Sequence, residues 1–461
     1  MKTHQFENQP VKSGVSKTEK IKRRRRKTLQ KILASTIILV IAIGLIALAF
    51  NSEFLKEFVD NRGRLPGTSR LESSESGPNP TSTPVPDLTS KVTIAFAGDI
   101  IMHDSLIEGG LRNDGSYNYN YMFDKIKDIV SSADYSIANF EGVLYGEPYS
   151  GWPYFNAPDE IASAIANSGF DMVTTANNHA YDKGMGGLTR TPGVFREQGV
   201  KVIGTRATTQ DPKFELVDIN GIKFAFSAYT YETEGTEENR ALNAIPMHEN
   251  ANILVDSFNP YRDERFIQDK ADIAQRARDM KAAGAQVVVF AMHWGDTYQN
   301  ASNYWQQELT QILADEGVDI IFGCHPNIIQ EISVVNSRKS DSKTLVYYSV
   351  GNLISNMTYD PNDSRTKGKV EDGIIARVEI QRDEQGNIKI TRGEYISLYV
   401  LKEDSSDKRK HTIIPVKLAL ADPEVYGISG FSKLVEDSYK RTTDFLKPFS
   451  GDREGILIGE H

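Results

Sequence analysis

Polar residues with the chemistry of metal ligands follow six short apolar segments of this chain. The segments have the composition of β-strands and cover 92–97, 135–138, 172–175, 287–291, 318–322 and 345–349. The polar residues that follow them include Asp99, Glu141, Asn178, His179, His293, His325, Asn327 and Asn352. Carboxylate and amide oxygens mixed with imidazoles suit Mn, Fe, Zn or Mg rather than a thiolate site.

The shared position of these residues carries more weight than any one of them. Taken singly, Asp99 is typical of a residue that caps a turn. His179 or His293 alone would be typical of an interior histidine whose hydrogen bonds are satisfied. In α/β proteins, however, ligands bind outside the carboxyl ends of the strands. The pattern therefore predicts one polar site where the strands end.

The segments between the strands predict helices, so the expected fold class is α/β. Amphipathic helices are expected at 121–131, 159–168, 262–283 and 302–316, and they alternate with the strands. After residue 373 the pattern changes to an antiparallel hairpin. Residues 432–446 predict a closing helix that ends before Pro448.

Charge and cysteine content exclude several classes of protein. The net charge is −9, and basic residues concentrate near the N-terminus, which leaves an acidic body. Nucleic-acid binding needs a basic surface, so we expect no nucleic-acid partner. Cys324 is the only cysteine, which excludes an intrachain disulfide and a cysteine-rich zinc site. Because the sequence shows no general base that would activate the thiol, we interpret Cys324 as a small residue that fills space.

An apolar segment near the N-terminus predicts a single membrane span. Residues 32–50 carry no charge and would form about 28 Å of helix, close to the thickness of a bilayer core. The basic run within residues 1–31 predicts a cytoplasmic tail, with the rest of the chain outside the cell membrane. A signal peptide cleaved after Ala49 is the alternative to this signal-anchor. Residues 51–90 predict a flexible extracytoplasmic linker, since much of this stretch is Gly, Ser, Thr and Pro.

The polar residues form motifs that, in this order along the chain, resemble one family. The motifs are GD at 98–99, NFE at 139–141, NNH followed by D-x-G at 177–184, HWG at 293–295, G-x-HP at 323–326 and YSVGN at 348–352. Together they resemble the CapA family of poly-γ-glutamate capsule biosynthesis proteins, and the anchored layout is similar to CapA and PgsA proteins of Gram-positive bacteria. The resemblance implies a four-layer α/β/β/α sandwich like that of calcineurin-like metallophosphatases. This domain would span 91–400, with 401–461 as a C-terminal extension.

The resemblance also implies roles for the residues. The implied ligands of a divalent metal (Mn, Fe, Zn or Mg) are Asp99, Glu141, Asn178, His293, His325 and Asn327. Glu141 would also take part in catalysis, and His179 would be a general acid or an electrostatic stabiliser. Asp182 would support His179 or form a turn. The family usually has G-x-H-P-H, and Asn327 replaces the last histidine here. An amide is a weaker ligand than imidazole, so this position would be weak, empty or filled by a harder ion such as Mg or Mn.

Three functions remain open at this point. The resemblance favours a membrane-anchored extracytoplasmic component of poly-γ-glutamate synthesis or export, with or without metal-dependent hydrolase or transferase chemistry. The alternatives are an extracellular metallophosphatase or phosphodiesterase, and a non-catalytic scaffold that binds the polymer. Export would require other membrane subunits as partners, since a single span forms no channel. Lys183, Arg190 and Arg206 would attract the polyanionic polymer close to the site.

Overall fold

The computed structural model describes residues 90–461, except 237–238, 359–365, 367–368 and 405–407. The expected tail and span, and the expected linker up to residue 89, lie outside the described residues. Within the described part of the chain, no helix is long and apolar enough to cross a membrane.

One mixed sheet of ten strands forms the first half of the fold. Its strands are β1 (Ser90–Ile101), β2 (Tyr135–Glu141), β3 (Met172–Thr174), β4 (Lys201–Ile203), β14 (Asn352–Ile354), β15 (Asp372–Arg382), β16 (Ile388–Asp404), β17 (Arg409–Pro415), β18 (Gly451–Arg453) and β19 (Ile456–Glu460). The order is β18-β19-β16-β15-β1-β2-β3-β4, with β14 paired to β1 and β17 to β16. Strands β1 to β4 run parallel, so their carboxyl ends meet at one edge.

A second sheet of seven strands packs against the first. Its strands are β5 (Glu215–Ile219), β6 (Ile222–Tyr231), β9 (Ser257–Phe258), β10 (Val287–His293), β11 (Ile320–Cys324), β12 (Ile332–Asn336) and β13 (Lys343–Tyr347). The order is β12-β13-β11-β10-β6-β5, with β9 paired to β6. Strands β6, β10, β11 and β13 are parallel. A small hairpin of β7 (Ala241–Leu242) and β8 (Ile245–Pro246) stands apart from both sheets.

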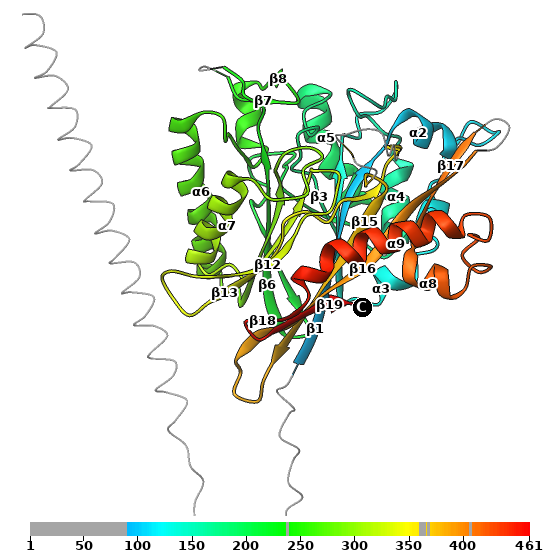
Figure 1. The fold of residues 1–461 in the computed structure, drawn as a ribbon. Helices are drawn as coiled ribbons and strands as arrows, with labels where there is room; N and C mark the ends of the chain where they lie inside the picture. Colours follow the sequence, from blue (N-terminus) through cyan, green and yellow to red (C-terminus); the bar gives the residue numbers. More distant parts are fainter. Residues whose placement is uncertain (1–89, 237–238, 359–365, 367–368, 405–407) are drawn as a thin grey trace, which may run out of the picture. The chain divides into compact units, whose positions relative to one another are not determined.

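Helices cover the outer faces of the two sheets. The helices are α2 (Asp104–Gly110), α3 (Lys127–Ser131), α4 (Glu160–Asn167), α5 (Gly184–Glu197), α6 (Asp263–Ala282), α7 (Tyr304–Asp315), α8 (Val416–Ala421) and α9 (Ser432–Leu446). Side chains from α6 and α7 share a buried cluster with the second sheet, and Figure 1 shows both helices on its outer side. Helices α2, α4 and α5 share another cluster with the first sheet, and a third cluster lies between the sheets. The fold is therefore a mixed α/β sandwich, which confirms the expected class.

The local sequence explains where most elements begin and end. The capping box of α7 joins the Asn303 side chain to the Gln306 backbone N–H at 3.0 Å and the Gln306 side chain to the Asn303 backbone N–H at 2.9 Å. Each expected strand matches an observed one, and four of the expected helices match α4, α6, α7 and α9. The expected helix at 121–131 is helical only from Lys127, after a 3-10 turn. The expected domain limit at residue 400 falls inside β16.

Two glycines allow the strand ends to approach one another closely. A Cβ atom on Gly98 would lie 1.8 Å from the backbone oxygen of Gly351, and one on Gly323 would lie 1.9 Å from that of Tyr348. No side chain fits at either place, because such contacts are far inside van der Waals distance. The glycines of the GD, G-x-HP and YSVGN motifs therefore bring the ends of β1, β11 and β13 together.

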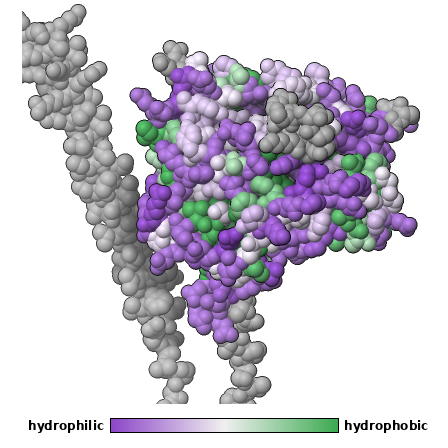
Figure 2. Space-filling model, viewed as in Figure 1, coloured by the Kyte–Doolittle hydropathy of each residue, from purple (hydrophilic) through white to green (hydrophobic). Residues whose placement is uncertain are grey.

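The surface of the sandwich offers little apolar area in the view of Figure 2. That face is mostly hydrophilic, and its hydrophobic residues form small patches. Apolar residues scattered in this way are normal on a protein surface and need no special explanation.

Candidate metal centre

The strand ends of both sheets place the expected site residues side by side. Asp99 on β1 is in register with Asn139 on β2, and His293 on β10 is in register with Cys324 on β11. None of the expected residues exceeds 7% relative exposure; these are Asp99, Glu141, Asn178, His179, His293, His325 and Asn327. Burial of so many polar groups demands partners or a bound ion.

Asp99 joins the two sheets through its carboxylate. Its Oδ1 accepts a hydrogen bond from Asn139 Nδ2 at 2.6 Å, and its Oδ2 accepts one from the backbone N–H of His325 at 3.0 Å. The Asn139 Oδ1 in turn accepts from Thr174 Oγ1 at 2.7 Å, which fixes the orientation of the amide. Asp99 is thus held on the first sheet while facing the end of β11 on the second.

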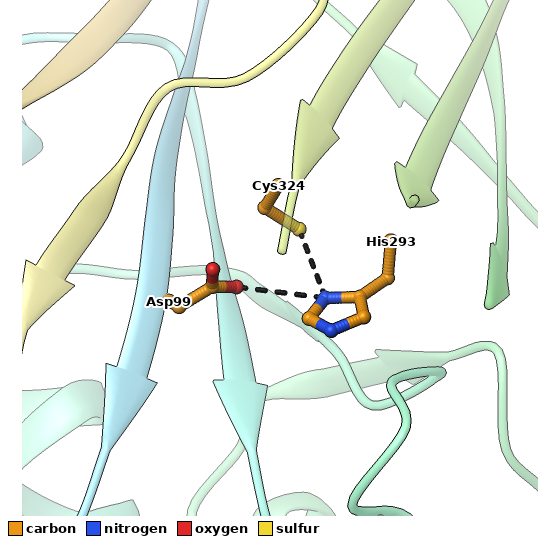
Figure 3. A group of neighbouring side chains, drawn as sticks. All are labelled: Asp99, His293 and Cys324. Carbon is orange, nitrogen blue, oxygen red and sulfur yellow. Dashed lines mark hydrogen bonds and ion pairs between the residues drawn. The ribbon is translucent and has the colours of Figure 1, made fainter. Parts of the chain in front are cut away.

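The His293 ring lies at the centre of the candidate metal centre, with a different neighbour on each nitrogen. Its Nδ1 lies 3.6 Å from Asp99 Oδ1 and 3.4 Å from Cys324 Sγ, as Figure 3 shows. Its Nε2 lies 2.7 Å from Asn178 Oδ1 and 3.9 Å from Glu141 Oε1. The structure therefore brings Asp99, Glu141, Asn178 and His293 together, as the sequence predicted.

His179 forms a buried pair with Asp182 at the side of the site. The His179 Nδ1 lies 2.7 Å from Asp182 Oδ2, which also accepts from the backbone N–H of Phe155 at 2.7 Å. The other oxygen of Asp182 accepts from Asn243 Nδ2 at 2.9 Å. This arrangement directs His179 Nε2 toward Glu141 Oε1, 3.7 Å away. Of the two readings of Asp182, the structure supports the one in which it positions His179.

The turn after β11 has unusual backbone geometry. His325 has φ of +99° and Asn327 has φ of +60°, a left-handed region that residues other than glycine rarely occupy. Asparagine tolerates this region better than most residues, which suits it to the position. The His325 ring packs against His293, with centroids 4.8 Å apart, and against Tyr231, with centroids 4.5 Å apart. His325 thus reaches the site from the second sheet.

Three buried polar atoms of the site have no hydrogen-bond partner within the described residues. They are Glu141 Oε2, His325 Nδ1 and Asn327 Oδ1. Unpaired buried atoms are costly, and the three at this site fit a bound group that would pair with them. Carboxylate, imidazole and amide atoms are ligands of divalent metals. The residues therefore fit a divalent ion. Two sets of donor atoms lie within 4.8 Å of one another, Asp99 with His293 and Cys324, and Glu141 with His293 and His325.

Burial sets the protonation of these groups in the absence of an ion. It raises the pKa of Asp99 to about 6 and, with the charges of Asp99 and Asp182, holds the pKa of Glu141 well above its usual range. Burial also lowers the pKa of His325 to about 3 and that of His293 well below its usual range. Both rings are therefore neutral at pH 7, which is the form that binds metals.

Two residues near the site carry no clear signal in the sequence. Asn243 lies in the β7–β8 turn with φ of +47° and donates to Asp182 and to the backbone oxygen of Pro153. Nothing in its local sequence marks it, because the hairpin reaches the site only through the fold. Cys324 has the sequence pattern of a filler, but its sulfur lies within 3.4 Å of His293 Nδ1.

Two of the three cations expected to attract a polyanion are already paired. Arg206 is buried against Asp256, with Nη1 to Oδ2 at 2.7 Å. Arg190 contacts Asp159, with Nη2 to Oδ2 at 2.6 Å. Paired guanidinium groups offer little net charge to a polymer, so this expectation is wrong for Arg206 and weakened for Arg190.

Comparison with known proteins gives a consistent family match. A family model described as bacterial capsule synthesis protein PGA_cap matches residues 93–357, more than half of the chain. The chain is 28% identical to capsule biosynthesis protein CapA of Bacillus anthracis over 60% of this chain and 62% of that protein. It is 25% identical to PGA biosynthesis protein CapA of Bacillus subtilis (strain 168) over 65% of this chain and 70% of that protein. The chain thus spans less than two thirds of the first of these relatives.

Solved structures give weaker likenesses. NAD nucleotidase (NadN) of Haemophilus influenzae gives a TM-score of 0.40 at 12% identity, over 81% of this chain and 65% of that one. The 5'-nucleotidase precursor from Thermus thermophilus gives a TM-score of 0.39 at 14% identity, over 77% of this chain and 59% of that one. At these TM-scores the likeness supports no conclusion about chemistry.

Proposed function

Because the chain belongs to the PGA_cap family of bacterial capsule synthesis proteins, we propose that it is a membrane-anchored, extracytoplasmic component of poly-γ-glutamate synthesis or export. The observation that carries this proposal is the placement of the site within the family match. All seven expected site residues fall between residues 93 and 357, and all seven are buried. The family region and the buried polar centre therefore coincide.

The proposed location rests on the sequence of the N-terminal segment. The apolar segment 32–50 and the basic residues before it support a single span with the body outside the cell membrane. A body held at the outer surface would meet the polymer as it leaves the cell. Other membrane subunits of a synthase or export complex would be its partners.

The proposed chemistry depends on a divalent metal at the strand ends. Asp99, Glu141, His293 and His325 would hold the ion, which supplies Lewis-acid polarisation and an activated water when bound. The His179–Asp182 pair sits beside Glu141 and would move a proton to or from a reacting group. Resemblance to calcineurin-like metallophosphatases is in keeping with this set of residues. Cleavage or transfer of the polymer is the reaction class that this chemistry would serve.

One observation favours a second candidate function. The three unpaired buried atoms at the site are more than a scaffold needs, because a scaffold gains nothing from unsatisfied polar groups. An extracellular metallophosphatase or phosphodiesterase would use the same residues on a phosphoryl group. A non-catalytic scaffold would retain the fold and bind the polymer without using these residues for chemistry.

Genetic complementation tests the proposal directly. The gene is deleted in its host, and cell-associated poly-γ-glutamate is measured after return of the full chain, of Asp99→Asn, or of the exposed control Glu384→Gln. We expect polymer to be lost on deletion and restored by the full chain and by the control. Failure of Asp99→Asn alone supports a metal-dependent role, whereas full restoration by it favours the scaffold. Normal polymer in the deletion strain would contradict the proposed function.

A further inference from the structure

The geometry points to Cys324 as a thiolate ligand that completes a metal position with Asp99 and His293, and we propose that this position binds a borderline or soft divalent ion such as zinc. This inference rests on the proposed metal site and adds the ligand that decides which metal it takes. It differs from the expectation that the Asn327 replacement leaves the Asp99 position weak, empty or filled by a harder ion such as Mg or Mn.

The three donor atoms are spaced as ligands around one ion. The His293 Nδ1 lies 3.4 Å from Cys324 Sγ and 3.6 Å from Asp99 Oδ1. Around a tetrahedral zinc ion, with metal–ligand distances of about 2.0 to 2.3 Å, neighbouring donors lie about 3.4 to 3.6 Å apart. The observed spacings therefore match a shared ion, and Figure 3 shows the three side chains converging from β1, β10 and β11.

Hydrogen bonds set which nitrogen of His293 faces this position. Asn178 Oδ1 lies 2.7 Å from His293 Nε2, and a carboxamide oxygen only accepts, so Nε2 carries the proton. Asn139 Nδ2 lies 3.4 Å from Nδ1 and is a donor, which agrees with a lone pair on Nδ1. The lone pair on His293 Nδ1 thus lies on the side of the ring that faces Cys324 and Asp99.

Charge balance supports the same ligand set. The relative exposures of Asp99, His293 and Cys324 are 0%, 1% and 1%, so an uncompensated charge here is costly. One carboxylate and one thiolate together neutralise a divalent ion, and the neutral imidazole adds no charge. The thiol releases its proton when the metal binds, as thiolate ligands do. Sulfur donors select zinc and similar ions over Mg or Mn.

The sequence makes this inference directly testable, because Cys324 is the only cysteine among the 461 residues. Any metal–thiolate absorption of the full chain therefore reports this residue. The full-length protein, purified in detergent and stripped of metal, is titrated with Co²⁺, and bound cobalt is measured alongside the near-ultraviolet spectrum. We expect a thiolate-to-cobalt charge-transfer band that saturates with bound cobalt and that zinc displaces. Cys324→Ser should abolish the band and weaken zinc affinity by about 100-fold, with manganese affinity changed little.

The outcomes separate this inference from the proposed metal site. Stoichiometric cobalt binding without the band overturns Cys324 as a ligand and leaves the site of Glu141 and His325 in place. Absence of cobalt binding overturns both. Cys324→Ala is a second variant, and the wild-type spectrum alone decides the question if neither variant folds.

Discussion

The rings of Phe96 and Phe322 stack across the interface between the two sheets, with centroids 4.9 Å apart and planes 3° apart. Phe96 lies on β1 three residues before Asp99, and Phe322 lies on β11 two residues before Cys324. Both rings are fully buried in the cluster between the sheets. The stacked pair therefore sets the distance between the two strand ends that meet at the site.

Replacing one of these aromatic rings by a smaller side chain should lower both stability and metal affinity. Phe322→Leu removes part of the stacked contact, and we expect the free energy of unfolding to fall by about 1 to 2 kcal/mol. Because the stacked rings would no longer hold the ends of β1 and β11 at the same distance, the affinity for zinc should fall as well. Urea unfolding and zinc titration check the two effects. Phe195→Leu in α5, equally buried but outside this interface, is the control. Equal loss of zinc affinity in both variants would show that Phe322 has no special part in spacing the site.

Replacing Asp182 should impair function while leaving the metal in place. Asp182 Oδ2 accepts from His179 Nδ1 and from the backbone N–H of Phe155, so in Asp182→Asn a neutral amide oxygen replaces the carboxylate oxygen and holds the ring less strongly. We expect polymer production to fall by at least about 10-fold with unchanged metal content. Measurement of both quantities in the complemented strain checks this. Asp159→Asn removes an exposed carboxylate paired with Arg190 and serves as the control. Undiminished production in Asp182→Asn would mean that His179 needs no orienting partner.

The pH dependence of stability should contain a contribution from His411. Its side chain is buried, its Nε2 lies 2.9 Å from Asn356 Oδ1, and burial lowers its pKa to about 3. The unfolded chain takes up the proton first, near pH 6.5, so stability falls as the pH drops from about 6.5 toward 3. At pH 5 this group alone costs about 2 kcal/mol.

Removing the imidazole tests that contribution. His411→Gln retains an N–H donor for Asn356 but binds no proton, so its urea midpoint should fall less than that of the wild type between about pH 7 and about pH 5. His461→Gln, which removes an exposed histidine, is the control. Identical pH dependence of wild type and His411→Gln would show that His411 is not the group responsible.

The proposed topology has a simple protease test. If residues 32–50 anchor the chain with the body outside, protease added to intact protoplasts should digest the body and leave the basic tail protected. Antibodies against the tail and against α9 distinguish the two parts. A body that resists protease in intact protoplasts and is cut only after lysis would contradict this topology.

Patterns in single segments predicted the sandwich well, but contacts between segments decided the details. The alternation of strands and helices was readable because β-branched and amphipathic stretches alternate. Helix α5 was not predicted from the sequence because its glycines and Pro192 lower its helix propensity. Packing against the first sheet stabilises it instead. The location of the site followed from polar residues at strand ends. The place of Cys324 beside His293 depends on the β10–β11 register, which no local pattern reveals.

Metal content of the full-length chain tests the central claim most directly. Elemental analysis of the wild type, Asp99→Ala, His293→Ala and the double variant should find at least one divalent ion per wild-type chain. Each single variant should lose most of the metal, and the double variant should lose little more, because a site without its ion has nothing further to lose. Melting temperatures of the four proteins should change much less than their metal content. Absence of metal in the wild type, or normal metal in all variants, would contradict the account.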